Sequence, residues 1–224
     1  EPRPGERVLD IGCGTGRLGA HVASLVAPDG RVFGIDPLPL RIEIAARKHR
    51  LFEASEGRAE DLSRFPGGTL DIAYMNSVFH WIEDKSTTLG EIRRVLKPGG
   101  RFGVNSADAS RPHQSAALVR EAAIEEGLDH ARVASSLATN YRVNGRELDA
   151  LLREAGFVEI RIEPHTFVDT LEGVDDLLAW SQSSSFGNFL ADLEPDERRR
   201  LRRRLEQKLE PLRTQTGIAL ERFT

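Results

Sequence analysis

Short apolar runs alternate with helical patterns of apolar positions through the first half of the chain. Val8-Leu9-Asp10-Ile11 is typical of a buried strand, and apolar residues at helical spacing follow it as far as the Pro-Asp-Gly turn at 28–30. The same alternation predicts further strands at 32–35, 51–54, 70–75 and from 102, with helices at 42–48 and 89–96. Strands that alternate with helices form parallel sheets, so the pattern predicts an α/β domain.

The regular alternation of strand and helix patterns does not continue in the second half of the chain. The pattern predicts helices near 116–126 and over 145–155, a sixth strand over 157–162, a helical segment over 174–212 and a last strand over 218–224. We interpret the segments at about 107–142 and 174–212 as helical insertions. The simplest organisation is then a single domain that spans residues 1–224.

Composition narrows the class of protein. No apolar run approaches the length of a membrane-spanning helix, so we expect no membrane association. The 31 basic and 35 acidic residues give a net charge of −4, which disfavours nucleic acid as a partner. The single cysteine, Cys13, can form neither an internal disulfide nor a multi-cysteine metal site, and it suggests a reducing, cytoplasmic location.

Both ends of the chain suggest a trimmed polypeptide. The chain begins without methionine and enters an apolar run almost at once, and it stops directly after a strand pattern. We therefore expect that it is part of a longer protein.

The most informative segment joins the first predicted strand to the first helix, from Val8 to Gly16. A strand that ends in alternating glycines lets backbone approach a ligand closely and leaves helix N–H groups exposed. Asp36 ends the second predicted strand, where a carboxylate can accept hydrogen bonds from both hydroxyls of a ribose. Together these features predict an adenosine-containing cofactor at the carboxyl ends of the first two strands.

Two cofactors compete for this loop. Residues 14–19 match the G-x-G-x-x-G pattern of dinucleotide enzymes, but the match begins two residues late, since Gly12 already ends the strand. Asp10, just before the loop, would repel a pyrophosphate and attract the ammonium group of a methionine. The loop therefore favours a methionine-bearing cofactor over a nicotinamide.

With this glycine loop and the motifs that follow it, the chain resembles the small-molecule type 11 branch of the class I S-adenosylmethionine-dependent methyltransferases. Five segments resemble the family motifs in order, namely 8–16, 34–36, 57–62, 71–81 and Leu96-Lys97-Pro98-Gly99-Gly100. The resemblance implies a Rossmann-like seven-stranded sheet of order 3-2-1-4-5-7-6, its last strand antiparallel, with helices on both faces. It also implies S-adenosyl-L-methionine as cofactor and S-adenosyl-L-homocysteine as product.

The same resemblance implies a set of cofactor-binding residues: Asp10, Gly12, Cys13, Gly14, Gly16, Asp36, Pro37, Ala59, Glu60 and Asn76. Many relatives carry an aspartate that meets the adenine amino group where this chain has Arg58. Glu60 or Asp61 is expected to take that role, with the backbone N–H of Ala59 serving a ring nitrogen.

His80 is the candidate catalytic base. By resemblance it lies at the carboxyl edge of the sheet, where the methyl group points, and an ordinary histidine pKa near neutrality suits a base. A contact in the pocket and a purely structural role remain open alternatives. The resemblance implies that the helical insertions at about 107–142 and 174–212 cap the substrate. Trp81, His113 and Tyr141 are candidates for the substrate pocket. No metal site is predicted, and the other histidines, His21 among them, are interpreted as bystanders.

We therefore predict methyl transfer to a small organic metabolite by in-line displacement, with O-, N- and C-methylation open, by a monomer or homodimer. Two alternatives stay open: a methyltransferase domain of a larger synthase that acts on a carrier-bound acyl chain, and a non-catalytic cofactor-binding or scaffold module. The arginine-rich segment 198–205 is interpreted as a solvated helix face, since Leu201, Leu205, Leu209 and Leu212 form one apolar stripe.

Overall fold

The computed structural model describes residues 1–111, 113–128, 141–184 and 193–224. The chain divides into two compact units, the first of residues Glu1–Ser106 and Tyr141–Ile162, the second of Ala107–Asn140 and Glu163–Thr224. In the described part of the chain, no helix is both long enough and apolar enough to cross a membrane. The second unit is made largely of the two segments that the sequence suggests are insertions, and the interpretation as one domain stays a prediction.

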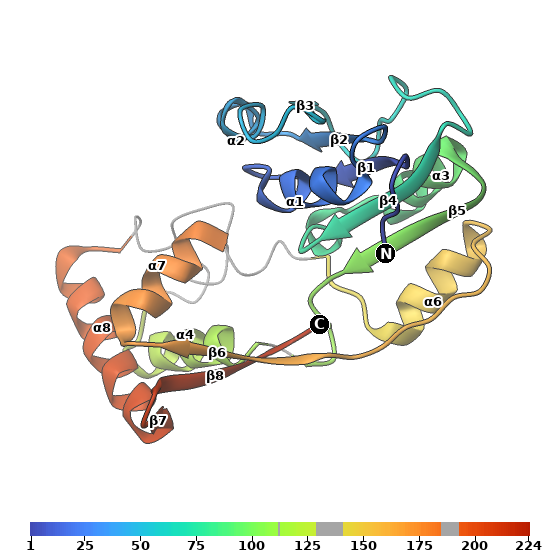
Figure 1. Cartoon of the computed structure of the whole chain (residues 1–224). Helices are drawn as coiled ribbons and strands as arrows, with labels where there is room; N and C mark the ends of the chain where they lie inside the picture. Colours follow the sequence, from blue (N-terminus) through green and yellow to red (C-terminus); the bar gives the residue numbers. More distant parts are fainter. Residues whose placement is uncertain (112, 129–140, 185–192) are drawn as a thin grey trace. The chain divides into compact units, whose positions relative to one another are not determined.

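The first unit is built on a parallel sheet of five strands in the order β3-β2-β1-β4-β5 (Figure 1). Its strands are β1 (Arg7–Ile11), β2 (Arg31–Asp36), β3 (Phe52–Glu56), β4 (Leu70–Asn76) and β5 (Leu96–Asn105). All four neighbouring pairs are parallel, so the carboxyl ends of the strands meet at one edge. This result confirms the Rossmann-like fold and the predicted order of the first five strands.

Helices cover both faces of this sheet because its strands are apolar on both sides. The unit contains α1 (Arg17–Val26), α2 (Pro39–Ala45), the 3-10 turn η1 (Phe79–Trp81), α3 (Lys85–Val95) and α6 (Gly145–Glu154). In β1, Val8 packs in a cluster with α1, while Leu9 and Ile11 pack in the cluster that contains α3 and part of α6. Since strand side chains alternate between faces, Asp10 lies on the α1 side.

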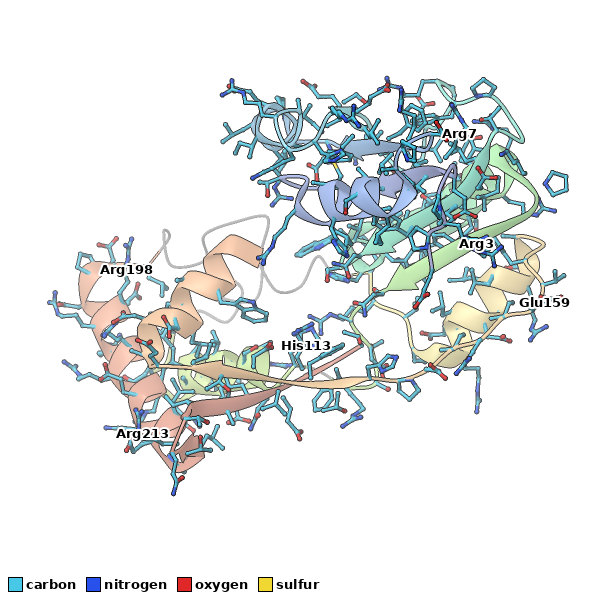
Figure 2. All side chains as sticks on the ribbon, in the orientation of Figure 1. Arg3, Arg7, His113, Glu159, Arg198 and Arg213 are labelled. Carbon is cyan, nitrogen blue, oxygen red and sulfur yellow. The ribbon has the colours of Figure 1, made fainter. Side chains whose placement is uncertain are left out.

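The expectation of one seven-stranded sheet is wrong for the described residues. After β5, the remaining strands pair in a separate antiparallel sheet of order β6-β8-β7. The segment 157–162 does not form a strand, because Glu159, labelled in Figure 2, has a φ of 54° that interrupts extended backbone. Phe157 and Ile160 instead pack on the core of the first unit, and Val158 is 80% exposed.

The second unit combines that antiparallel sheet with helices. It contains α4 (Gln114–Glu125), β6 (Thr166–Leu171), α7 (Val174–Ser184), α8 (Pro195–Leu209), η2 (Glu210–Leu212), β7 (Arg213–Thr214) and β8 (Gly217–Phe223). Ile218 and Leu220 of β8 share a buried cluster with α4 and α8. The predicted terminal strand is therefore confirmed as β8, which pairs with β6 on one side and with β7 on the other.

The arginine-rich segment lies on α8. Leu201, Leu205 and Leu209 are buried, as the predicted apolar stripe requires. Arg204 and Lys208 form ion pairs with glutamates of α4, including Glu125. The basic face of α8 is thus largely engaged by acidic side chains of its own unit.

Candidate functional site

The carboxyl ends of β1 and β4 and the start of α1 enclose an open cavity of about 540 Å³ in the first unit. Its walls include five of the residues predicted to bind a cofactor, namely Asp10, Gly12, Cys13, Gly14 and Asn76. Ligands of open α/β sheets bind in such a crevice at the carboxyl edge, where the strand order reverses between the first and fourth strands. The cavity is therefore the candidate site.

The glycine loop between β1 and α1 forms one wall. Gly12, Gly14 and Gly16 have φ angles of 75°, 55° and 76°, which residues with a side chain rarely adopt. A Cβ atom on Gly12 would lie 2.3 Å from Cγ2 of Val78, whereas a Cβ atom on Gly14 would meet nothing within 4 Å. Gly12 is thus a packing requirement, and Gly14 leaves its backbone open to a ligand.

Asp10 is the most unusual group in the cavity wall. It is 2% exposed, and its Oδ2 atom has no hydrogen-bond partner among the residues that the structure describes. Burial, together with the nearby charge of Asp36, raises the pKa of Asp10 to about 7, although the neighbouring hydroxyl of Tyr74 opposes this shift. The Tyr74 hydroxyl itself forms no hydrogen bond of normal geometry. A cation in the cavity would satisfy the Asp10 carboxylate.

Asp36 is placed at the end of β2, as predicted, but its oxygens already have partners. Its Oδ2 atom accepts a hydrogen bond from the Gly14 amide, and its Oδ1 atom accepts one from the Leu38 amide, both at 3.0 Å. The guanidinium of Arg41 lies 3.8 Å from the same Oδ2. Asp36 therefore holds the glycine loop in place from the neighbouring strand.

The other predicted cofactor residues do not line the cavity. Gly16 is the N-cap of α1, and a Cβ atom there would lie 2.6 Å from the Phe52 ring. Pro37 is exposed next to Asp36, and Ala59 belongs to the buried core. Glu60 lies near Arg58, with 3.8 Å between its Oε2 and the guanidinium Nε. Their roles in cofactor binding stay predictions.

His80 lies on η1, in the connection that follows β4. It is 9% exposed, and its Nδ1 atom lies 3.1 Å from the hydroxyl of Ser106, just beyond the end of β5. Its ring centroid is 5.2 Å from that of Trp81. The Ser106 hydroxyl therefore restrains one ring nitrogen of His80. His80, Trp81 and Ser106 are not among the residues that line the cavity, and the roles of His80 and Trp81 stay predictions.

The two remaining substrate-pocket candidates belong to different units. Tyr141, in the first unit, lies over the ammonium of Lys85 at 5.7 Å from ring centroid to Nζ, and its hydroxyl bonds to Glu83. His113, labelled in Figure 2, belongs to the second unit, where its Nδ1 accepts a hydrogen bond from the Phe223 amide at 3.2 Å. Their roles in a substrate pocket stay predictions.

The sequence analysis missed part of the cavity wall. Thr15, Arg17, Leu18 and His21 also line it. The interpretation of His21 as a bystander considered only metal spacing. A usable signal was present, because Arg17 and His21 are four residues apart and so lie on one face of α1.

Comparisons with known proteins agree on one family. Residues 9–104 match the model of a methyltransferase domain, Methyltransf_11. The chain is 30% identical over 213 residues to nocamycin O-methyltransferase of Saccharothrix syringae, covering 88% of this chain and 75% of that protein. It is 40% identical over 116 residues to demethylmenaquinone methyltransferase of Symbiobacterium thermophilum, covering 49% and 45%.

A solved structure resembles the fold. Phosphoethanolamine N-methyltransferase 2 of Haemonchus contortus, in complex with S-adenosyl-L-methionine, aligns with all of this chain and 48% of its own, at a TM-score of 0.57 and 18% identity. The chain spans about half the length of two of the curated relatives it matches, 48% of one and 45% of the other.

Proposed function

The chain belongs to the class I S-adenosylmethionine-dependent methyltransferases of type 11, and from this premise we propose that the protein transfers a methyl group to a small organic acceptor. Membership confirms the resemblance inferred from the motifs, and S-adenosylmethionine is the cofactor of the family. The proposal concerns the activity of the whole protein. The observation that carries it is the composition of the cavity wall. This wall combines the open backbone of Gly14 with the carboxyl group of Asp10, whose Oδ2 atom has no hydrogen-bond partner among the described residues.

The residues in the cavity fit this cofactor. The methionine ammonium matches the unpartnered Oδ2 of Asp10, and its charge would favour the ionised form of that group. The exposed backbone of Gly14 gives close access to the cofactor chain, and Asp36 is proposed to bind the ribose hydroxyls. Arg17, which also lines the cavity, offers positive charge for the carboxylate of the cofactor.

When bound, the cofactor supplies a methyl group already activated by the positive sulfonium. The protein therefore has three tasks: it must hold the acceptor in line, exclude water and accept a proton where the acceptor is neutral. We propose His80 for the last task. When the Ser106 hydroxyl accepts a hydrogen bond from Nδ1–H, Nε2 is the unprotonated ring nitrogen, which is the form that can act as the base.

Oxygen is the acceptor atom that we favour. The relative named as an O-methyltransferase matches over 88% of this chain, whereas the demethylmenaquinone methyltransferase matches over 49%. An oxygen acceptor with an acidic proton also suits a histidine base, because their pKa values can be similar.

Calorimetric titration of the full-length protein tests the proposal. We expect S-adenosylmethionine and S-adenosylhomocysteine to bind with micromolar dissociation constants, and NAD not to bind. Screening of acceptors with labelled S-adenosylmethionine would then identify the substrate. Lack of binding by the first two compounds would overturn the proposal and favour a scaffold role.

A further inference from the structure

A second feature of the first unit is a buried lysine, Lys85, at the first position of α3. It is 7% exposed, and its ammonium lies 5.0 Å from the centroid of the Phe79 ring and 5.7 Å from that of Tyr141. Its one hydrogen bond in the described chain goes to the carbonyl of Ile82. A lysine ammonium has three N–H donors, so two remain for another group.

No carboxylate among the described residues compensates this charge. Glu83 bonds to the Tyr141 hydroxyl, and both oxygens of Asp84 accept hydrogen bonds from Thr87. Burial alone lowers the pKa of Lys85. An ammonium at the start of a helix is also opposed by the helix dipole. Among the described residues, the Ile82 carbonyl and the rings of Phe79 and Tyr141 offset its charge, and none of these groups is an anion.

Arg142 is a second cation with an N–H donor that lacks an acceptor among the described residues. Arg142 directly follows Tyr141, and its Nε atom is buried without a hydrogen-bond partner in the described part of the chain. Burial lowers the pKa of Arg142 as well, with no acidic group acting on it. A buried N–H of a charged group that is left unpaired destabilises the folded state.

Lys85 ends the connection between β4 and α3, which also carries the candidate base His80, and Arg142 follows Tyr141, which contacts Lys85. This connection starts after Asn76, which lines the cofactor cavity, carries His80 on η1, and ends at Lys85. Tyr141 contacts two residues near the end of this connection. The ring of Tyr141 lies against the Lys85 ammonium, and the hydroxyl of Tyr141 interacts with the Glu83 carboxylate. Lys85 and Arg142 therefore both adjoin Tyr141, and both carry N–H donors that have no acceptor among the described residues.

We propose that Lys85 and Arg142 bind a carboxylate of the methyl acceptor, so that the substrate is a small organic acid. This inference rests on the proposed function, because it assigns the substrate class of that site. Lys85 supplies two free N–H donors, and Arg142 supplies the unpaired Nε–H and its fork of further donors. Phe79 and Tyr141 form the apolar sides of the ammonium pocket.

Carboxylate binding is measured by calorimetry on the full-length protein saturated with S-adenosylhomocysteine. The probes are acetate and benzoate, with acetamide and benzamide as neutral counterparts at constant ionic strength. We expect at least one of the two carboxylates to bind, and neither amide. Lys85→Met and Arg142→Gln should each weaken that binding by about tenfold, as loss of a charge-assisted hydrogen bond implies. Lys48→Met and Arg146→Gln, both at exposed positions, are the matched controls and should bind like the wild type.

A second readout needs no variant. The chain has four lysines, so Cε signals from ¹³C-labelled lysine can be assigned and titrated individually. Lys85 should lose its proton at lower pH than an ordinary lysine, and the binding carboxylate should raise the midpoint of Lys85. The inference is overturned if neither carboxylate shifts the midpoint of Lys85. It is also overturned if Lys85→Met and Arg142→Gln fold and bind the carboxylates as tightly as the wild type does. Failure of S-adenosylhomocysteine to bind would instead overturn the proposed function.

Discussion

The carboxylate of Asp36 accepts a hydrogen bond from the backbone amide of Gly14 across two neighbouring strand ends, at 3.0 Å. The other oxygen of the same carboxylate accepts the Leu38 amide. One buried side chain therefore fixes the glycine loop and the start of the segment after β2. The residue expected to bind ribose is also the residue that shapes the loop.

Replacement of Asp36 by alanine should abolish tight cofactor binding and also lower the free energy of unfolding. Two backbone amides would lose their acceptor, and each unsatisfied buried donor costs about 1–3 kcal/mol. Asp36→Asn keeps an acceptor for one amide and should retain more stability while still losing at least tenfold in affinity. Calorimetry with S-adenosylhomocysteine and urea unfolding measure the two effects. Unchanged affinity in the Asp36→Ala variant would refute the ribose assignment.

Asp10 should make the stability of the protein depend on pH in the direction opposite to most carboxylates. Its pKa is about 7 in the folded state, against an ordinary value of 3.8, so the folded state keeps this proton longer. The stabilisation that comes from the neutral form is complete below pH 3.8 and is lost as the pH rises toward 7. Asp10→Asn removes this loss, so the variant should gain stability relative to the wild type by up to about 1.4 kcal/mol per pH unit across this window.

Urea unfolding of both proteins from pH 4 to pH 8 measures this difference. Asp29→Asn, at an exposed turn position, is the control and should track the wild type. A constant difference between Asp10→Asn and the wild type over the whole range would show that the Asp10 carboxyl titrates normally.

The segment from β1 through the glycine loop to α1 could be predicted from the sequence because its signals are local. An apolar run, alternating glycines and a helical pattern occupy consecutive residues, and each demands its own backbone geometry. The acidic partner Asp36 was found in the same way, at the end of the next strand. Its hydrogen bond to Gly14 joins residues that are 22 apart, and no local pattern encodes such a contact.

The second half of the fold could not be predicted in this way. The segment 157–162 has the composition of a strand, yet the positive φ of Glu159 interrupts it and its apolar residues pack on the core. β8 pairs with β6 rather than with β5, a choice between long-range partners of similar apolar character. Arg142 is another example, since only the structure shows that its Nε is buried without a partner.

Alanine substitutions at Gly12 and Gly14 should differ sharply in their effect on folding. Both positions have positive φ, which costs an alanine about 1–2 kcal/mol. At Gly12 the new Cβ would also overlap Val78 at 2.3 Å, so Gly12→Ala should destabilise the protein more than Gly14→Ala. Gly14→Ala should mainly weaken cofactor binding, because its Cβ projects into open space beside the cavity.

Thermal unfolding and calorimetry of the two variants separate these effects. The double variant Gly12→Ala/Val78→Ala should recover part of the lost stability, because the overlapping atoms of Val78 are removed. Equal destabilisation by the two single variants would show that steric overlap at Gly12 is not decisive.

His80→Ala should lower turnover by about 10²-fold or more if His80 is the general base, with the affinity for S-adenosylmethionine changed little. Ser106→Ala removes the hydroxyl that restrains Nδ1 and should lower turnover about fivefold, the equivalent of a hydrogen bond worth about 1 kcal/mol. Ser106→Thr retains the hydroxyl and should restore most of the activity. Turnover is measured as a function of pH on the acceptor identified by screening.

The histidine ring provides an independent readout, because ¹⁵N shifts report which nitrogen carries the proton. The Nδ1 and Nε2 signals of His80 should be those of a single tautomer in the wild type and should move toward a mixture in Ser106→Ala. A purely structural role for Ser106 would leave this tautomer ratio unchanged while lowering the melting temperature. If His80→Ala keeps wild-type turnover across the pH range, His80 is not the base, and Ser106 then has no catalytic residue to position.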